Sequence, residues 1–182
     1  MSERTLTIHA LREHSACDLD ERIEALETHL DREVGEMEPV PLRDWFAVTP
    51  RLVDRVWALR CFEDGPQVAV TLALHCLEAR AQRPEQAPLR GILEAASLYF
   101  ETGCEAGAFL QARERAERDY PEYAFLYWTL SAVNWYRRDP QEYRSVVLAN
   151  VYFAFYGLKY YDYDVIDPRD ARVFLNELLG ME

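Results

Sequence analysis

The sequence predicts an all-α protein, and three observations lead to that fold class. A turn built from an aromatic residue, two intervening residues and then Gly or Asp occurs three times, ending at Gly65, Gly103 and Asp139. These positions are 38 and 36 residues apart, which is the length of one helical hairpin. Prolines punctuate the chain at helix starts, and after residue 10 no run alternates as a strand does. We therefore expect stacked antiparallel helical hairpins, as a regular array or as an irregular helical bundle.

The composition is that of one globular helical domain. The chain has 182 residues, of which 49% are hydrophobic and 29% are charged, with 7 glycines. A chain of this length buries about 70% of its unfolded surface, which is enough for one core. We expect residues 1–17 to form an N-terminal arm and residues 18–182 a single helical domain. Thr5 to His9 alternates like a strand, but no second strand is evident to pair with it, so we expect a short extended or helical arm.

The helices follow in order from apolar spacing and from capping residues. Asp18 stands where it would cap the first helix, and Gly35 stands where it would end it. Thr49, Asp139 and Asp167 each precede a proline, which is a start signal for a helix. The predicted helices cover residues 19–34, 42–47, 50–62, 66–81, 87–102, 104–119, 121–138, 140–161 and 168–179.

The helix at 140–161 differs from the others. From Val146 to Tyr156 it is apolar on every side, so it must be covered on every side. It is therefore either the central element of the domain or half of a subunit interface. The second alternative predicts a homodimer through helix 140–161.

The middle of the chain resembles a tetratricopeptide helical hairpin. Ala96, Tyr99, Gly103 and Ala108 hold the small, aromatic, glycine and alanine positions of that family in register, and the resemblance is best over residues 90–121. In the family, the small residues let paired helices approach closely and the glycine permits a tight turn. The two flanking copies match less well, and the third has Arg144 where a small residue belongs.

The resemblance implies a protein–protein interaction module. The first helix of each pair would line a concave groove that binds a peptide or a helix of a partner protein. Phe62, Phe100 and Tyr136 would form an aromatic stripe in this groove; alternatively, the three rings are ordinary core. The implied contact residues are Arg55, Leu59, Phe62, Leu93, Ser97, Phe100, Thr129, Val133, Tyr136 and Arg137.

The charge suggests a different kind of partner. A net charge of −12 disfavours nucleic acid and anionic membrane surfaces as ligands. The segment from Glu13 to Asp44 is strongly acidic, which is typical either of a solvated face or of a patch that attracts a basic partner. The second interpretation gives an alternative function, an acidic inhibitor or immunity-type protein that masks a basic toxin or enzyme. Charge reversal at Asp20, Glu24 and Glu27 would then abolish binding.

Sequence motifs for catalysis, cofactors and metals are weak. The chain has no nucleophile elbow, no glycine-rich phosphate loop and no His-Glu-x-x-His pattern, so we expect neither an enzyme nor a cofactor. The spacing of His9, His14 and Cys17 matches no standard zinc finger. Cys61, His75 and Cys76 would complete such a site only across the hairpin 50–81, and we expect buried thiols and a satisfied imidazole there instead. His75 and His9 are nevertheless the first residues to inspect for an unrecognised active site.

Two further segments bear on calcium binding and on location. Tyr160 to Asp167 resembles the start of a calcium loop but lacks the turn glycine, and Val173 stands where a bidentate Glu is required. We expect a capped loop there. The N-terminus has no apolar signal segment, and the longest uncharged stretch, Ser145 to Leu158, is too short to cross a bilayer. We expect a cytoplasmic protein with reduced cysteines.

Overall fold

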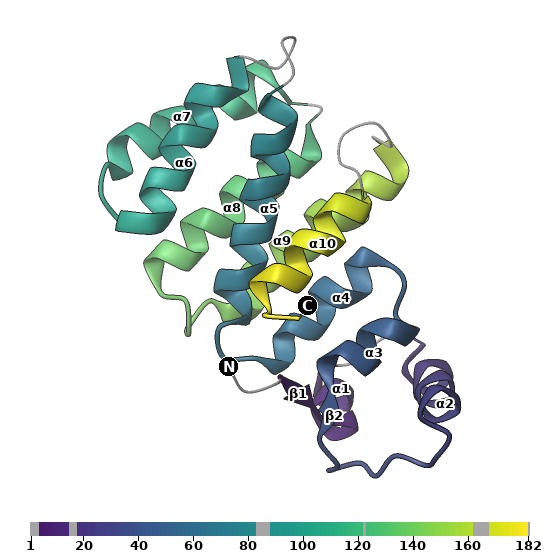
Figure 1. Cartoon of the computed structure of the whole chain (residues 1–182). Helices are drawn as coiled ribbons and strands as arrows, with labels where there is room; N and C mark the ends of the chain where they lie inside the picture. The colour runs from purple at the N-terminus through teal and green to yellow at the C-terminus, as the bar shows by residue number, and fades with distance from the viewer. Residues whose placement is uncertain (1–3, 15–17, 83–87, 122, 162–167, 182) are drawn as a thin grey trace.

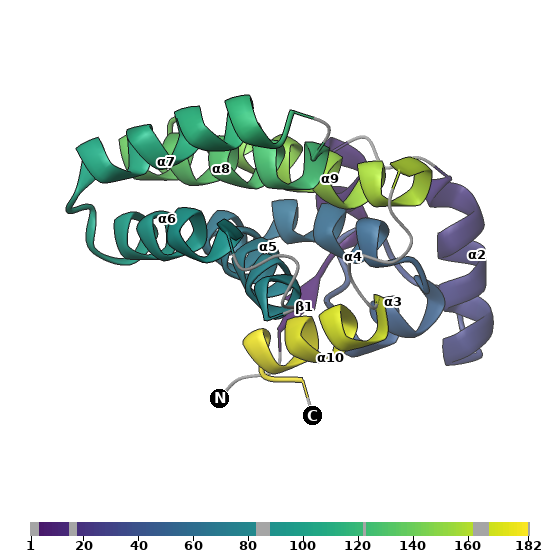
Figure 2. The same cartoon turned by 90° about the horizontal axis from the view of Figure 1, so that it is seen from above.

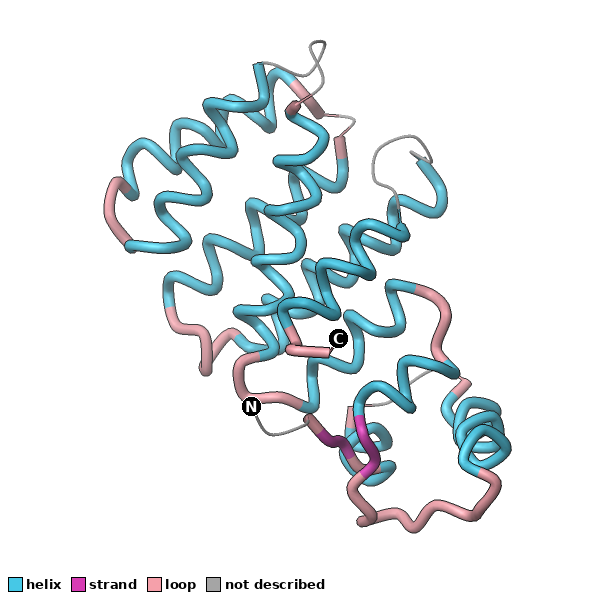
Figure 3. Tube along the Cα trace, viewed as in Figure 1, coloured by secondary structure: helices cyan, strands magenta, loops and turns pink. Residues whose placement is uncertain are grey.

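The fold is all-α, as predicted, with one small strand pair (Figures 1 and 3). The computed structural model describes residues 4–14, 18–82, 88–121, 123–161 and 168–181. The strands are β1 (Thr5–Leu6) and β2 (Val40–Pro41). The helices are α1 (Ile8–Glu13), α2 (Leu19–Leu30), α3 (Leu42–Val48), α4 (Leu52–Ala58) with the 3-10 turn η1 (Leu59–Cys61), α5 (Gly65–Ala81), α6 (Arg90–Thr102), α7 (Ala106–Asp119), α8 (Ala124–Arg138), α9 (Arg144–Tyr161) and α10 (Pro168–Leu178).

Every predicted helix is present, and the differences lie at the ends. The predicted cap at Thr49 is wrong, because its buried hydroxyl donates back to the carbonyl of Trp45 and α4 starts three residues later. Asp139 does cap: its Oδ1 accepts the N–H groups of Gln141 and Glu142 at 2.8 and 2.9 Å. A turn follows this cap, so α9 begins only at Arg144. Asp167 and the calcium-loop residues 162–167 lie outside the described residues.

The first long helix ends earlier than predicted. Asp31 adopts a left-handed conformation with φ 53°, and α2 stops at Leu30 rather than at Gly35. The backbone N–H of Val34 is satisfied by the Glu27 carboxylate at 2.9 Å instead of by a helical carbonyl. The capping role predicted for Asp18 is also wrong, because its side chain makes no cap hydrogen bond.

The N-terminal arm has a strand partner that sequence reasoning missed. Thr5 pairs with Pro41 and Leu6 with Val40 in an antiparallel ladder. The partner strand β2 lies in the segment of the chain between α2 and α3. The side chains of Leu6, Ile8 and Leu11 are buried in the same hydrophobic core as the later helices. The arm is therefore extended at β1 and helical at α1, and it packs on the rest of the chain.

The helices lie in layers (Figure 2). Helices α7, α8 and α9 form one layer, α6, α5 and α4 form the next, and α10 covers α5 and α4 on the side away from α9. Helices α6 and α7 pack as a hairpin, and so do α8 and α9. Helix α9 also packs against α4 and α5, two hairpins back in the chain. This contact closes the row of hairpins into a bundle and makes α9 a central element.

The three predicted turns share one pattern of burial. The alanine that lies seven residues before each turn position is fully buried: Ala58, Ala96 and Ala132. The aromatic residues that start the turns are half-buried in all three: Phe62, Phe100 and Tyr136. The turns themselves differ, because Gly103 is left-handed with φ 72° whereas Gly65 lies against the carbonyl of Leu59.

Arg144 stands where a small residue belongs in the third copy of the repeat, and its side chain attaches α9 to the first turn. Its guanidinium donates to the carbonyl oxygens of Arg60 at 2.9 Å and Glu63 at 2.8 Å, and also to that of Phe62. Carbonyls at the end of a helical turn need such donors, since no further helical N–H reaches them. This long side chain therefore fixes the contact that closes the bundle.

Candidate functional site

The structure divides the ten predicted groove residues into two groups. Leu59, Leu93, Thr129 and Val133 are buried in the core, so they are not accessible to a partner in this structure. The other six are half-buried: Arg55, Phe62, Ser97, Phe100, Tyr136 and Arg137. All six have internal contacts. Arg55 donates to the carbonyls of Thr49 and Phe46, and Ser97 donates to Glu78 at 2.9 Å.

The predicted aromatic stripe is brought together in part. The rings of Phe100 and Tyr136 are 5.0 Å apart, and Arg137 donates to the carbonyl oxygen of Phe100 at 3.4 Å. Phe62 instead lies under the guanidinium of Arg4, 5.6 Å from the ring centroid. Two of the three rings therefore form a pair, and the third has a cationic partner from the N-terminal arm.

A shallow pocket lies where the first and third turns meet. It has a volume of about 400 Å³ and is lined by Tyr136, Glu63, Asp64, Pro66, Gln67, Pro140 and Gln141. Asp64 is engaged by Arg4 through two hydrogen bonds of 2.7 Å, and this pairing lowers the pKa of the Asp64 carboxyl. The pocket is open and polar, and we call it the turn pocket.

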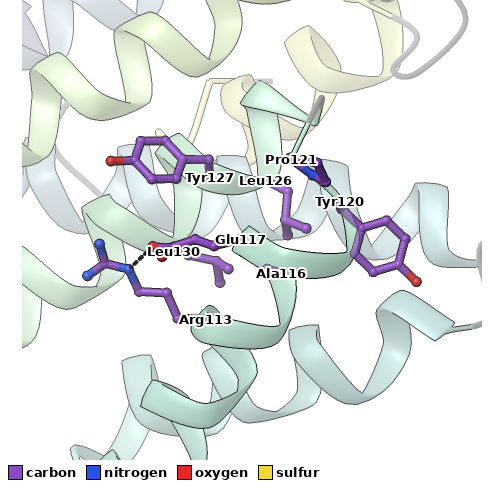
Figure 4. Close-up of a pocket in the computed structure, with 8 residues that line it drawn as sticks. All are labelled: Arg113, Ala116, Glu117, Tyr120, Pro121, Leu126, Tyr127 and Leu130. Atoms are coloured by element: carbon purple, nitrogen blue, oxygen red, sulfur yellow. Dashed lines mark hydrogen bonds and ion pairs between the residues drawn. The ribbon is translucent and has the colours of Figure 1, made fainter.

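A more enclosed and more apolar pocket lies between α7 and α8 (Figure 4). We call it the α7–α8 pocket; its volume is about 250 Å³. Leu126, Leu130 and Ala116 are buried beneath it, and Arg113 and Glu117 form an ion pair of 3.0 Å at its rim. The remaining lining residues are Tyr120, Pro121 and Tyr127. This pocket offers an apolar floor with a polar edge.

A group of aromatic side chains on α8 and α9 adjoins that pocket, and we call it the ring patch. Its members are Tyr127, Trp128, Tyr152, Phe153 and Tyr156. Successive rings are in contact, with centroid distances of 5.1 Å for Tyr127–Trp128, 5.4 Å for Trp128–Phe153, 5.8 Å for Phe153–Tyr152 and 5.7 Å for Tyr152–Tyr156. Phe153 is 47% exposed and Tyr127 42% exposed. Trp128 and Tyr152 are half-buried between the exposed rings. Exposed apolar patches of this kind are typical of interaction surfaces.

Sequence reasoning did not identify the α7–α8 pocket or the ring patch, although one signal was available. Tyr127 and Trp128 are adjacent on one helix, and adjacent helical residues point about 100° apart. Two such bulky side chains reach the same core only where it covers both directions, as happens for Trp45 and Phe46 on α3, which are both buried. On a helix that is covered from one side, the adjacency of Tyr127 and Trp128 indicates that one of them is exposed.

The acidic residues of the alternative function have mixed surroundings. Glu24 is exposed, and Asp20 is exposed but pairs with Arg12 at 3.1 Å. Glu27 is half-buried and holds the backbone of Val34. Two of the three carboxylates, those of Asp20 and Glu27, thus have intramolecular contacts that a charge reversal would also disrupt.

The groups considered for metal or nucleophilic chemistry lie in ordinary packing. No group of three or more His, Cys, Asp or Glu side chains able to hold a metal occurs among the described residues, which exclude Cys17. His75 stacks on Phe174 with ring centroids 3.6 Å apart. Burial raises the pKa of Cys61 to about 11 and that of Cys76 to about 12, so both thiols are protonated at neutral pH.

His14 makes stability depend on pH. Its ring lies edge-on to Trp57 with centroids 6.5 Å apart, and burial followed by the charges of Arg60 and Arg144 lowers the pKa of His14 below 6.5. The unfolded chain therefore binds a proton at His14 more readily than the folded chain does. The stability that neutral His14 contributes is complete at a pH above the pKa of His14 in the unfolded chain. It is lost as the pH falls from there through the pKa of His14 in the folded chain.

We expect His14→Gln to reduce the fall in stability on acidification. Urea midpoints of the parent and the variant at about pH 7.5 and about pH 5.5 measure the effect, across the range in which histidine titrates. If the urea midpoint fell by the same amount between the two pH values in the variant as in the parent, the assignment to His14 would be contradicted.

In the parts of the chain that the structure describes, no helix has the length and apolar character needed to span a membrane.

In comparisons with known proteins, no family model, no curated protein and no solved structure matches this chain.

Proposed function

We propose that this protein is a cytoplasmic protein–protein interaction module that binds an amphipathic helix of a partner protein at the α7–α8 pocket. The observation that carries the proposal is the apolar lining of that pocket, in which Leu126 and Leu130 are buried beneath the half-buried Tyr120 and the exposed Tyr127. An apolar anchor in a pocket surrounded by a polar rim is the usual arrangement at the centre of a protein interface.

The size and chemistry of the pocket favour one kind of occupant. At about 250 Å³ it is smaller than most pockets that enclose a whole small molecule, and it suits one or two apolar side chains. Its rim carries charges of both signs, Arg113 and Glu117, which match the polar flank of an amphipathic helix better than a purely apolar ligand. Such a helix would insert residues spaced three and four apart.

The proposal keeps the resemblance to a tetratricopeptide hairpin for α6 and α7. Ala96 is fully buried, Gly103 is left-handed between the two helices, and Tyr99 stacks on Phe109 with centroids 4.6 Å apart. These contacts support the proposed hairpin. Ala108 is exposed, so the neighbouring Phe109 supplies the buried contact on α7.

Selection of helical peptides from a display library tests the proposal. We expect the selected sequences to be amphipathic, and we expect Tyr127→Arg to weaken their binding at least tenfold, about 1.4 kcal/mol. Tyr127 is exposed at the pocket rim, so the variant should fold normally. The matched control is Tyr136→Arg, which alters the turn pocket and the predicted aromatic stripe and should leave binding unchanged.

Two results would overturn this choice of surface. Loss of binding in Tyr136→Arg but not in Tyr127→Arg would assign binding to the turn pocket and the stripe. Selection of basic peptides that dissociate as salt rises, and that bind both variants as tightly as the parent, would favour the acidic inhibitor. Charge reversal at Asp20 and Glu24 would then abolish binding. The homodimer predicted through helix 140–161 concerns a neighbouring surface and remains a separate proposal.

A further inference from the structure

The ring patch is free of charge along both helices that carry it. Helix α8 has no charged residue from Ala124 to Tyr136, and α9 has none from Ser145 to Tyr156, in a chain of which 29% is charged. Arg51 and Arg60 interact electrostatically with Tyr152. Helices α8 and α9 pack together along their length, so the rings form one surface.

We infer that the ring patch is the contact of a symmetric dimer, with Phe153 close to the two-fold axis. Interfaces between identical chains bring the same residues face to face, so charged residues near the axis meet like charges. A protein with a net charge of −12 repels its own copy over most of its surface. A second copy therefore needs a neutral, apolar contact, whereas a basic partner would be attracted by the acidic surface. Of the ring-patch members, Phe153 is the most exposed and contacts rings on both sides.

The size of the patch predicts a weak dimer. Three of the five rings are about two fifths exposed and the other two are half-buried, so with roughly 200 Å² of surface for each ring they present on the order of 300 Å². A stable interface needs about 800 Å² from each partner, so the rings supply its centre and not all of it. We expect a dissociation constant on the order of 10–100 μM. Association should tighten as salt rises from about 0.05 to about 0.5 M, because salt screens repulsion between the acidic copies.

Sedimentation equilibrium of the full chain tests the inference. The parent should pass from monomer to dimer with rising concentration, and Phe153→Arg should raise the dissociation constant at least tenfold. Phe153→Glu alone should do the same. An equimolar mixture of the two variants should dimerise again, because Arg then faces Glu across the axis. Tyr156→Arg provides a second exposed position, and circular dichroism checks that each variant is folded.

The matched control is Val173→Arg, because the Val173 side chain is 57% exposed. Val173 belongs to α10, which packs on α5 and α4 on the side away from α9 (Figure 2). This control should leave the dissociation constant unchanged. A parent that stays monomeric at about 1 mM, a dimer that is insensitive to Phe153→Arg, or a mixture that fails to dimerise would each overturn the inference. The two proposals are tested separately because Phe153, unlike Tyr127, does not line the α7–α8 pocket. Phe153→Arg should therefore weaken the dimer and retain the selected peptides.

Discussion

Replacing Gly65 by alanine should lower the free energy of unfolding by about 3 kcal/mol. A Cβ atom at this position would lie 1.9 Å from the carbonyl oxygen of Leu59 and 2.9 Å from its carbonyl carbon. Both are backbone atoms, so no side chain is able to move aside and the turn between η1 and α5 must open. The same turn receives the hydrogen bonds of Arg144, so opening it also weakens the attachment of α9.

Urea unfolding followed by circular dichroism measures this loss. The matched control is Gly91→Ala in α6, where a Cβ would meet nothing within 4 Å. Alanine is the better helix former, so the control should gain up to about 1 kcal/mol. The same substitution is thus expected to have opposite signs at the two sites. A neutral Gly65→Ala would contradict the close approach of η1 and α5.

The three turns show how far sequence reasoning reaches. Their positions were predictable because an alanine and an aromatic residue at fixed distances before each turn are local features of helix packing, and the three alanines are equally buried. The reason for the final residue was predictable at two of the turns: Asp139 accepts two backbone N–H groups as a cap, and Gly103 adopts a left-handed conformation in a tight turn. It was not predictable at Gly65, which avoids the carbonyl oxygen of Leu59, a contact that the motif does not specify.

Contacts between distant segments account for what the sequence did not predict. The ladder of Thr5 and Pro41 joins a segment that alternates like a strand to a partner of only two residues, which is too short to carry a strand signal. The resemblance assigned Leu59, Leu93, Thr129 and Val133 to the groove of an open array, but helices two hairpins apart pack together here and these side chains lie inside. The α7–α8 pocket and the ring patch arise from which helix faces remain uncovered. Coverage is a property of the whole bundle and not of one helix.

Asp54→Asn should lower the free energy of unfolding by about 3 kcal/mol. The Asp54 carboxylate lies 3.0 Å from the guanidinium of Arg22 on α2 and 2.6 Å from Nε of Arg51. The side chains of Arg22 and Asp54 are only 12% and 11% exposed, so the pair joins α2 to α4 with little help from water. The asparagine leaves the Arg22 charge buried without a carboxylate. Most of the loss is the cost of that unpaired charge.

A double substitution separates the unpaired charge from the rest of the interaction. Arg22→Met combined with Asp54→Leu removes both charges, and we expect it to recover most of the stability that Asp54→Asn loses, because apolar pairs replace buried ion pairs well. The matched control is Asp119→Asn, whose carboxylate pairs with Arg118 at 2.8 Å on the exposed end of α7. Water solvates both partners there, so no measurable loss is expected. Two results would contradict this explanation: a loss of stability in Asp54→Asn no larger than that in Asp119→Asn, or a double variant no more stable than Asp54→Asn. Either result would mean that the unpaired charge of Arg22 is not what destabilises the Asp54→Asn variant.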